Sequence, residues 1–330
     1  MSKTMKPDSR FQLVKPSTRS FIREAKSAKD YSLYDFLHGY FYARWLYLYI
    51  GFGTGELPLA RRIKSILRWY DKKIHFWNNN SSIEVDNHLE SPNSSNSKTF
   101  AEGYHGKVVP LESAKRLVTV GEDIDLPNLE HIVPYQRARD IILRNPDHIA
   151  IMDCPCRTSR PNPCLPLDVC LVIGEPFAGF VIEHHPERAR WINPDEAVEI
   201  LEAENERGHV HHAFFKDAML GRFYAICNCC SCCCGAMQSQ RNGTPMLASS
   251  GYISQVDDEL CIGCSDCTEF CQFGALTLVG YTASVDQNAC MGCGVCVDKC
   301  IQGALYLRRD ASKGEPLEIC ELMEHASLDP

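Results

Sequence analysis

The pattern of apolar and polar positions divides the chain into an apolar N-terminal segment, a polar stretch and a longer mixed region. Residues 31–52 carry ten aromatic side chains among 22 positions, which predicts a packed helix. Residues 78–99 are rich in Asn and Ser and offer nothing for a core, which is typical of a linker. From residue 100 onward, apolar runs alternate with turn residues, so we expect a mixed α/β region.

Three short segments of the mixed region have a clear local pattern. A proline at the start and an Asn-Pro pair at the end predict a helix over residues 134–145. Residues 148–152 have the composition of a short strand that leads to Cys154. Asn193, followed by a proline and two carboxylates, predicts the start of another helix, and Gly208 predicts its end.

Cysteine changes this picture more than any other residue, with 19 in a chain of 330. No N-terminal run has the order of a secretory signal peptide, and no apolar run reaches the roughly 18 residues that a spanning helix needs. We therefore expect the chain in the cytoplasm, where cysteine clusters indicate metal or redox chemistry rather than structural disulfides. These features argue against a secreted disulfide scaffold.

Charge is unevenly distributed along the chain. The formal net charge is −8, but residues 1–77 contain 15 Lys and Arg against 6 Asp and Glu, and the remainder contains 19 against 36. The acidic majority argues against nucleic-acid binding. The basic end would suit an acidic partner protein or peripheral binding at the anionic inner face of a membrane. The alternative for residues 31–52 is that they are packed core. The basic stretch of this N-terminal end contains Arg61, Arg62, Lys64, Arg68, Lys72 and Lys73.

An internal repeat with a period of 29 residues occupies the last quarter of the chain. The unit that begins at Tyr252 aligns with the unit that begins at Tyr281, and all four cysteines of each unit recur in register. Within each unit the cysteines have the spacing C-x2-C-x2-C-x3-C. We expect each unit to form a strand, a cysteine loop, a short helical turn and a second strand.

This spacing resembles that of the bacterial two-cluster [4Fe–4S] ferredoxins, over about 60 residues. The resemblance implies two [4Fe–4S] clusters with crossed ligation, because the fourth cysteine of each unit binds the cluster of the other. Cluster I would take Cys261, Cys264, Cys267 and Cys300, and cluster II would take Cys290, Cys293, Cys296 and Cys271. The proline that usually follows the fourth cysteine is Gln272 in one unit and Ile301 in the other. A pair of zinc sites is the alternative.

Ten further cysteines lie in the middle region, and we expect them to bind metal. They are Cys154, Cys156, Cys164, Cys170, Cys227, Cys229, Cys230, Cys232, Cys233 and Cys234. They could hold one or two additional iron–sulfur clusters, or an unusual cluster bridged by adjacent cysteines; zinc and reactive thiols are the alternatives. The layout over residues 105–240 is similar to a cysteine-rich module that is fused to ferredoxin repeats in anaerobes.

Other candidates favour simpler interpretations. His209, His211 and His212 fall in an expected strand and are more typical of core or surface positions than of a metal site. Cys320 is expected to be a lone free thiol. The glycine-rich residues 51–56 lack the Lys-Ser/Thr of a phosphate-binding loop, so they do not indicate a nucleotide site.

Together these patterns predict an α+β multidomain protein. We expect a basic mobile N-terminus (1–30), an aromatic and basic helical module (31–77), a linker (78–99), a cysteine-rich mixed α/β domain (100–248), a ferredoxin-like two-cluster βαβ repeat (249–310) and an acidic tail (311–330). The predicted function is to relay single electrons to redox partner proteins through several iron–sulfur clusters. The alternatives are an oxidoreductase or enzyme subunit with a substrate-accessible cluster in the middle domain, and a binding or maturation module that holds clusters or zinc.

Overall fold

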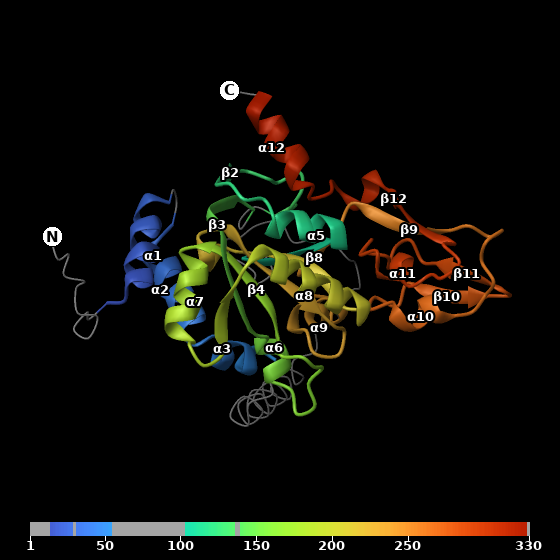
Figure 1. Cartoon of the computed structure of the whole chain (residues 1–330), viewed down its shortest axis with the longest axis horizontal. Helices are drawn as coiled ribbons and strands as arrows, with labels where there is room; N and C mark the ends of the chain where they lie inside the picture. Colours follow the sequence, from blue (N-terminus) through green and yellow to red (C-terminus); the bar gives the residue numbers. More distant parts are fainter. Residues whose placement is uncertain (1–13, 29–30, 55–102, 136–138, 329–330) are drawn as a thin grey trace, which may run out of the picture.

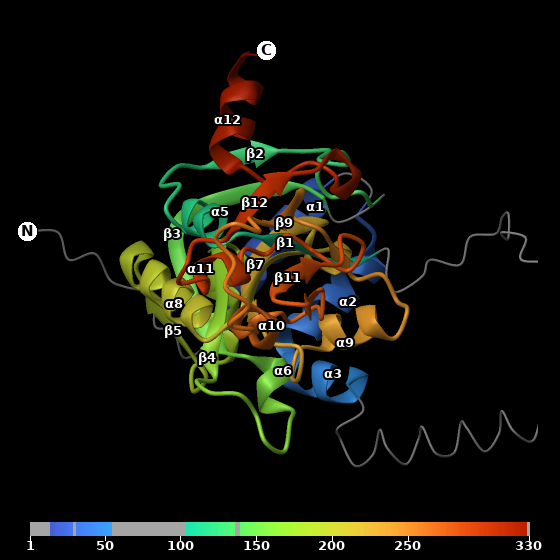
Figure 2. The same cartoon turned by 90° about the vertical axis from the view of Figure 1, so that its right-hand side faces the viewer.

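The computed structural model describes residues 14–28, 31–54, 103–135 and 139–328. Three helices open the described chain: α1 (Pro16–Ser27), α2 (Leu33–Arg44) and α3 (Leu46–Gly53). The predicted linker and the basic stretch from Arg61 to Lys73 lie outside the described residues. Figures 1 and 2 show the helices, the central sheet and the C-terminal repeat from two directions.

A large twisted sheet forms the centre of the middle domain. Its strands follow the order β2-β3-β4-β7-β6-β1-β8. Strand β5 lies on the same edge of β3 as β2 and pairs with the part of β3 that β2 leaves free. Only the β1–β8 pair is parallel among these described strands. The strands are β1 (Tyr104–Val109), β2 (Ile124–Leu126), β3 (Ile141–Asp153), β4 (Asp168–Glu175), β5 (Ala189–Ile192), β6 (Val210–Lys216), β7 (Arg222–Cys229) and β8 (Leu247–Ala248).

Helices cover both faces of this sheet, so its strands are buried on both sides. Along β3, Ala150 and Met152 contribute to one core, and Ile149 and Ile151 contribute to the other. The first core is completed by α1, α2, α3, α7 (Phe177–His184) and α9 (Gly235–Arg241). The second is completed by α5 (Leu111–Val118), α8 (Pro194–Glu206) and α12 (Ile319–Leu328). The cysteines of the middle domain lie on the side of the first core.

The predicted helix over residues 134–145 is wrong. Residues from Ile141 onward belong to β3, where Ile141 and Leu143 are buried and the residues between and after them are less so. This alternation matches β pairing with β2, and the tertiary contact overrides the helical start signal of Pro134. The short strand predicted at residues 148–152 is confirmed as part of β3.

The predicted helix that begins after Asn193 is confirmed as α8. The Asn193 side chain accepts a hydrogen bond from the backbone N–H of Glu196, at 2.8 Å. Gly208 has a φ of +79°, the left-handed conformation expected of a glycine that follows a helix.

The N-terminal helices pack on the middle domain, which differs from the expectation of a mobile N-terminus and a separate helical module. Phe21 of α1 is completely buried against Phe177 and Phe180 of α7. Tyr42 of α2 and Leu46 of α3 are also buried in the first core. In Figure 1, α1, α2 and α3 lie on the side of the sheet opposite to the C-terminal repeat.

The two repeat units have the predicted order of elements and interlock. The first contains β9 (Tyr252–Val256), α10 (Asp266–Phe270) and β10 (Leu276–Val279); the second contains β11 (Thr282–Val285), α11 (Val295–Asp298) and β12 (Leu305–Arg309). The first strand of each unit pairs with the last strand of the other, as β9 with β12 and β11 with β10. The chain then returns to the middle domain, where Leu317 and Ile319 are buried beside α5.

Within the described ranges, no helix is long and apolar enough to cross a membrane.

Candidate metal centres

Two small cavities of about 20 Å³ each lie between the repeat units. Each cavity receives three cysteines from the loop of one unit and the fourth cysteine of the other. The first is lined by Cys261, Cys264, Cys267 and Cys300, and the second by Cys290, Cys293, Cys296 and Cys271. The structure therefore brings together the two sets of four that the ferredoxin resemblance implies, while ligation itself stays a prediction.

Backbone N–H groups point at the sulfurs of both sets. Ser254 N–H donates to Sγ of Cys290, and its repeat counterpart Ala283 N–H donates to Sγ of Cys261, both at 3.4 Å. Cys271 and Cys300 also accept backbone N–H bonds, from Ala275 and Ala304 at 3.2 and 3.3 Å. Such donors stabilise negative charge on thiolate sulfur, so these surroundings fit an anionic cluster.

Glycine is required where the cysteine loops meet the opposite unit. A Cβ at Gly263 would lie 2.4 Å from the carbonyl oxygen of Tyr281, and a Cβ at Gly292 would lie 2.1 Å from that of Tyr252. Both glycines also have positive φ, +68° and +66°. Any side chain there would separate the two units and open both cavities.

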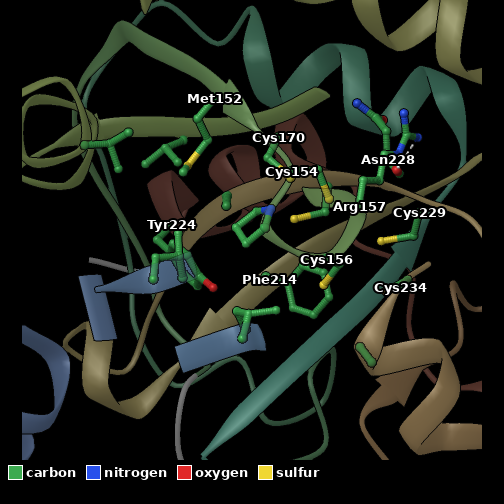
Figure 3. A pocket seen from close by; sticks show the side chains of 18 of the residues that line it. Met152, Cys154, Cys156, Arg157, Cys170, Phe214, Tyr224, Asn228, Cys229 and Cys234 are labelled. Atoms are coloured by element: carbon green, nitrogen blue, oxygen red, sulfur yellow. Dashed lines mark hydrogen bonds between the residues drawn. The ribbon is translucent and has the colours of Figure 1, made fainter. Parts of the chain in front are cut away.

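A third cavity, of about 70 Å³, lies in the first core of the middle domain (Figure 3). Eight of the ten middle-domain cysteines line it, among them Cys230 and Cys233. The other six are Cys154, Cys156, Cys170, Cys227, Cys229 and Cys234. Cys170 of β4 is the partner of Cys227 on β7, and Cys229 is two residues further along the same face of β7. The other three are carried by α6 (Pro155–Thr158) with the residue before it, and by the residue before α9.

These six thiols are in mutual contact. Cys154 interacts with Cys156 and Cys170, Cys170 continues to Cys227, and Cys156 continues to Cys234 and from there to Cys229. The contact with Cys156, followed by burial, raises the pKa of Cys154 to about 12. The contact with Cys234 lowers the pKa of Cys229, but burial outweighs it and brings that pKa to about 12. Without metal the thiols of Cys154 and Cys229 stay protonated at neutral pH, so a bound metal would have to displace their protons.

A buried cation borders this cavity. Arg157 is 1% exposed, and its guanidinium donates to Glu204 at 2.5 Å, to the carbonyl of Asn228 at 3.1 Å and to that of Pro166 at 2.5 Å. Glu204 is also buried and lies 2.6 Å from Nδ1 of His209. Arg157 immediately follows Cys156, so its charge lies where several thiolates would gather, and it would offset part of their negative charge.

The N-terminal helices close the third cavity. Tyr42 of α2 and Leu46 and Ile50 of α3 line it from the side opposite the sheet. The hydroxyls of Tyr42 and Tyr224 are 2.9 Å apart and completely buried, which fastens α2 to β7. One face of the aromatic segment is therefore core and covers the cysteines, while the opposite face, with Phe41 and Trp45, is exposed.

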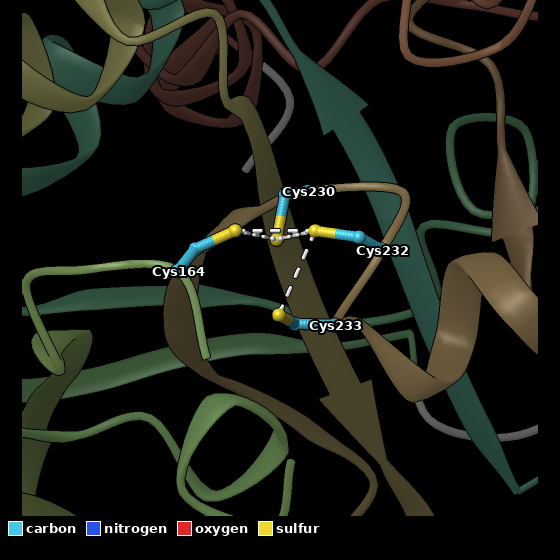
Figure 4. A group of neighbouring side chains, drawn as sticks. All are labelled: Cys164, Cys230, Cys232 and Cys233. Carbon is cyan, nitrogen blue, oxygen red and sulfur yellow. Dashed lines mark hydrogen bonds between the residues drawn. The ribbon is translucent and has the colours of Figure 1, made fainter. Parts of the chain in front are cut away.

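Cys230 and Cys233 also belong to a tighter group of four, with the exposed Cys232 and the partly exposed Cys164 (Figure 4). The sulfurs of Cys164, Cys230, Cys232 and Cys233 all lie within 4.8 Å of one another. The shortest separation, between Cys164 and Cys232, is 3.1 Å; Cys230 lies 3.4 Å from Cys232, and Cys233 lies 3.6 Å from it. Burial raises the pKa of Cys232, but its contacts with the other three thiols outweigh burial and lower that pKa overall. We call this group the four-thiol site.

A polar contact joins the C-terminal repeat to the four-thiol site. The side chain of Gln272, next to Cys271, accepts a hydrogen bond from the backbone N–H of Ser231 at 2.8 Å. It also donates to the carbonyl oxygen of Gly208 at 3.0 Å. Gln272 occupies the position where ferredoxins usually have proline, so this departure from the pattern has a structural role.

His211 and His212 of β6, and His209 just before it, are buried core residues, one of the positions that their pattern favoured. Burial lowers the pKa of His211 to about 4 and that of His212 to about 3, so both are neutral at physiological pH. Cys320 is exposed on α12 and forms no disulfide. Sequence reasoning missed Arg157 and Glu204, although an arginine directly after a Cys-Pro-Cys motif was a signal that could have been weighed.

Comparison with known families supports the C-terminal interpretation. The family model of a 4Fe-4S dicluster domain matches residues 253–301. No curated protein matches the chain. The match and the four-thiol site together indicate an iron–sulfur protein with a function in electron transfer.

Proposed function

We propose that this chain relays single electrons between two [4Fe–4S] clusters in its C-terminal repeat and a thiolate-bound centre in its middle domain. In this proposal Cys261, Cys264, Cys267 and Cys300 bind one cluster, and Cys290, Cys293, Cys296 and Cys271 bind the other. The six linked thiols of the third cavity, from Cys154 to Cys234 but without Cys230 and Cys233, hold a further iron–sulfur cluster. When bound, such clusters supply one-electron redox chemistry.

The contact of Gln272 with Ser231 carries this proposal. Ser231 lies between Cys230 and Cys232, and Gln272 directly follows Cys271, so one side chain connects ligand loops of two different sites. Phe273 and Met291, which flank the second repeat cavity, also pack on the core that contains the third cavity. Such direct packing keeps the sites at a fixed, short separation, which electron transfer requires.

A pair of proline variants tests the relay. Gln272→Pro and Ile301→Pro each restore the usual ferredoxin residue, but only the first removes the contact with Ser231; Ile301 is 79% exposed. After rapid mixing of anaerobic protein with a reductant, freeze-quench electron paramagnetic resonance would follow both domains. We expect slower reduction of the middle domain in Gln272→Pro and an unchanged rate in Ile301→Pro. Equal rates in all three proteins would contradict the proposal.

The crossed ligation has its own test. Cys271→Ser should damage the cluster of Cys290, Cys293 and Cys296, while Cys300→Ser should damage that of the first unit. Each variant should leave the other cluster's spectrum largely intact. Loss of the cluster nearest in sequence to the changed residue would show that the ligation is not crossed.

A second candidate function is an oxidoreductase with a substrate-accessible centre. The third cavity has more than three times the volume of either repeat cavity, and Cys156 also lines an adjoining cavity of about 200 Å³. That cavity contains the buried Lys216, whose ammonium lies 4.6 Å from the ring centre of Tyr42 and which would favour a small anionic substrate. A middle-domain resonance that shifts on addition of small carboxylates or oxyanions, in the wild type but not in Lys216→Met, would support this function. No shift with any of them would count against it.

We also propose that the N-terminal helices contact an anionic membrane surface. Apolar side chains at helical spacing along α2 and α3 are exposed to solvent: Leu33, Tyr34, Leu37, Phe41, Trp45, Leu48 and Phe52. In the sequence, a basic stretch follows them. Co-sedimentation with anionic vesicles should weaken at high salt and in Phe41→Ser/Trp45→Ser, but not in the exposed-aromatic control Tyr281→Ser. Equal binding of all variants would refute this role.

A further inference from the structure

We propose that the four-thiol site, Cys164, Cys230, Cys232 and Cys233, binds a single thiophilic metal ion, iron or zinc, in tetrahedral coordination. It is thus a mononuclear site, distinct in kind from the clusters proposed for the other thiols. The proposal concerns the identity of the site and stands on its geometry. Only the suggestion that an iron ion here would take part in the relay rests on the proposed function.

The spacing of the sulfurs carries the inference. Around one ion with metal–sulfur bonds of about 2.3 Å, the sulfurs of a regular tetrahedron lie about 3.8 Å apart. In the four-thiol site the closest pairs are 3.1, 3.4 and 3.6 Å apart, and all pairs are within 4.8 Å. In a cubane each thiolate binds its own iron and points outward, so every sulfur–sulfur edge grows by the iron–iron separation. The observed edges leave no room for that separation.

Contacts between sulfurs separate this site from the six linked thiols of the third cavity. Cys230 and Cys233 line that cavity too, but their sulfurs gather with those of Cys164 and Cys232, whereas Cys234 contacts Cys156 and Cys229. Cys232 is the sulfur on which the other three converge. Neighbouring cysteines in the sequence therefore serve different centres, and the six cysteines between 227 and 234 divide equally into two sets of three.

One side of the site is open to solvent, as expected of an exchangeable ion. Cys232 is exposed and Cys164 is partly exposed, whereas Cys230 and Cys233 are buried and also line the third cavity. Arg160 donates to the carbonyl oxygen of Cys233 at 3.1 Å, and Gln238 donates to that of Cys232 at 2.8 Å. These bonds fix the loop that carries three of the four ligands.

Metal and acid-labile sulfide, measured per chain on anaerobically purified full-length protein, would test the site. Cys164→Ser should lose one metal ion and no sulfide. Cys320→Ser, which removes an exposed thiol on α12, should lose neither. Elemental analysis of the lost ion distinguishes iron from zinc. Loss of iron and sulfide in equal numbers would show that the four thiols bind a cluster, and an unchanged metal content would show that they bind nothing; either result overturns the proposal.

A conservative variant guards against a folding defect. Cys232→His keeps four ligands, because three cysteines and one histidine also form tetrahedral sites, so the ion should be retained. With iron bound, the charge-transfer absorption of the mononuclear ferric centre should shift, while the cluster signals stay unchanged. In the wild type, a disulfide between Cys164 and Cys232 detected by thiol mapping would refute metal binding at this site.

Discussion

The buried pair of Arg157 and Glu204 offers the sharpest test of how the middle domain holds its thiols. Glu204→Gln preserves the shape of the side chain but removes its charge, which leaves the guanidinium of Arg157 buried without its carboxylate partner. Both side chains are 1% exposed, and their atoms are 2.5 Å apart. Breaking a buried ion pair by removing one partner typically costs about 3–5 kcal/mol.

That loss would lower the folding equilibrium constant by a factor of roughly 10² to 10⁴. With a urea m-value of about 3 kcal/mol/M, the unfolding midpoint should fall by roughly 1–1.7 M. Glu202→Gln is a matched control on the same helix, because Glu202 is half-exposed and its pair with Lys115 should contribute at most about 1 kcal/mol.

The pair also predicts how stability depends on pH. Burial raises the pKa of Glu204, but the hydrogen bond with His209 and the charge of Arg157 outweigh it, so the folded-state pKa is lowered. The stabilisation is therefore fully present above the unfolded-state pKa of about 4.3 and is lost as the pH falls through the folded-state value. Urea titrations between pH 3 and 7 would show this dependence in the wild type and not in Glu204→Gln. The pH at which the protein loses its clusters sets the lower limit of this range. If Glu204→Gln costs no more than Glu202→Gln, the ion pair does not anchor the site.

Three other variants have defined outcomes. Burial lowers the pKa of Lys216 to about 8, so stability should rise between about pH 8 and 10.5; Lys216→Met should remove that rise and be more stable at pH 7 in urea unfolding. Gly292→Ala should lose the absorbance of the second repeat cluster, whereas Gly314→Ala, with a φ of +80° but no atom within 4 Å of the added Cβ, should retain it. Tyr42→Phe should lower the melting temperature through a loss of about 1 kcal/mol, because the hydroxyl of Tyr224 loses its buried partner; a melting temperature equal to that of the wild type would contradict this.

The repeat was predictable because its information is local. Four cysteines at fixed spacing, with glycines at the turns, determine each loop, and the second copy confirms the pattern. The capped helix after Asn193 was predictable for the same reason. The strand β3 was not predictable, because the local signal at Pro134 favoured a helix. The alternating burial of Ile141 and Leu143 arises only from the pairing of β3 with β2 and β4.

The division of the ten middle-domain cysteines also depends on contacts that are remote in sequence. Cys164 joins Cys230 across 66 residues, and Cys170 faces Cys227 only because β4 and β7 are neighbours in the sheet. Spacing along the chain predicted metal binding by these residues but could not divide them into six and four. The role of Gln272 was equally hidden, because its two partners belong to another domain.

The cover over the third cavity has a consequence for the order of biosynthesis. Its parts are far apart in the sequence: Leu46 and Ile50 of α3 are made early, but the cavity is incomplete until Cys234 has been added. Once α2 and α3 have docked, four of the six thiols are buried and Cys156 and Cys227 are half-buried, so we expect metal to enter more readily before this docking. Leu46→Ala/Ile50→Ala should accordingly load faster from a cluster donor and lose its iron sooner to a chelator. The N-terminal helices would then dock after the metal has bound and slow its release.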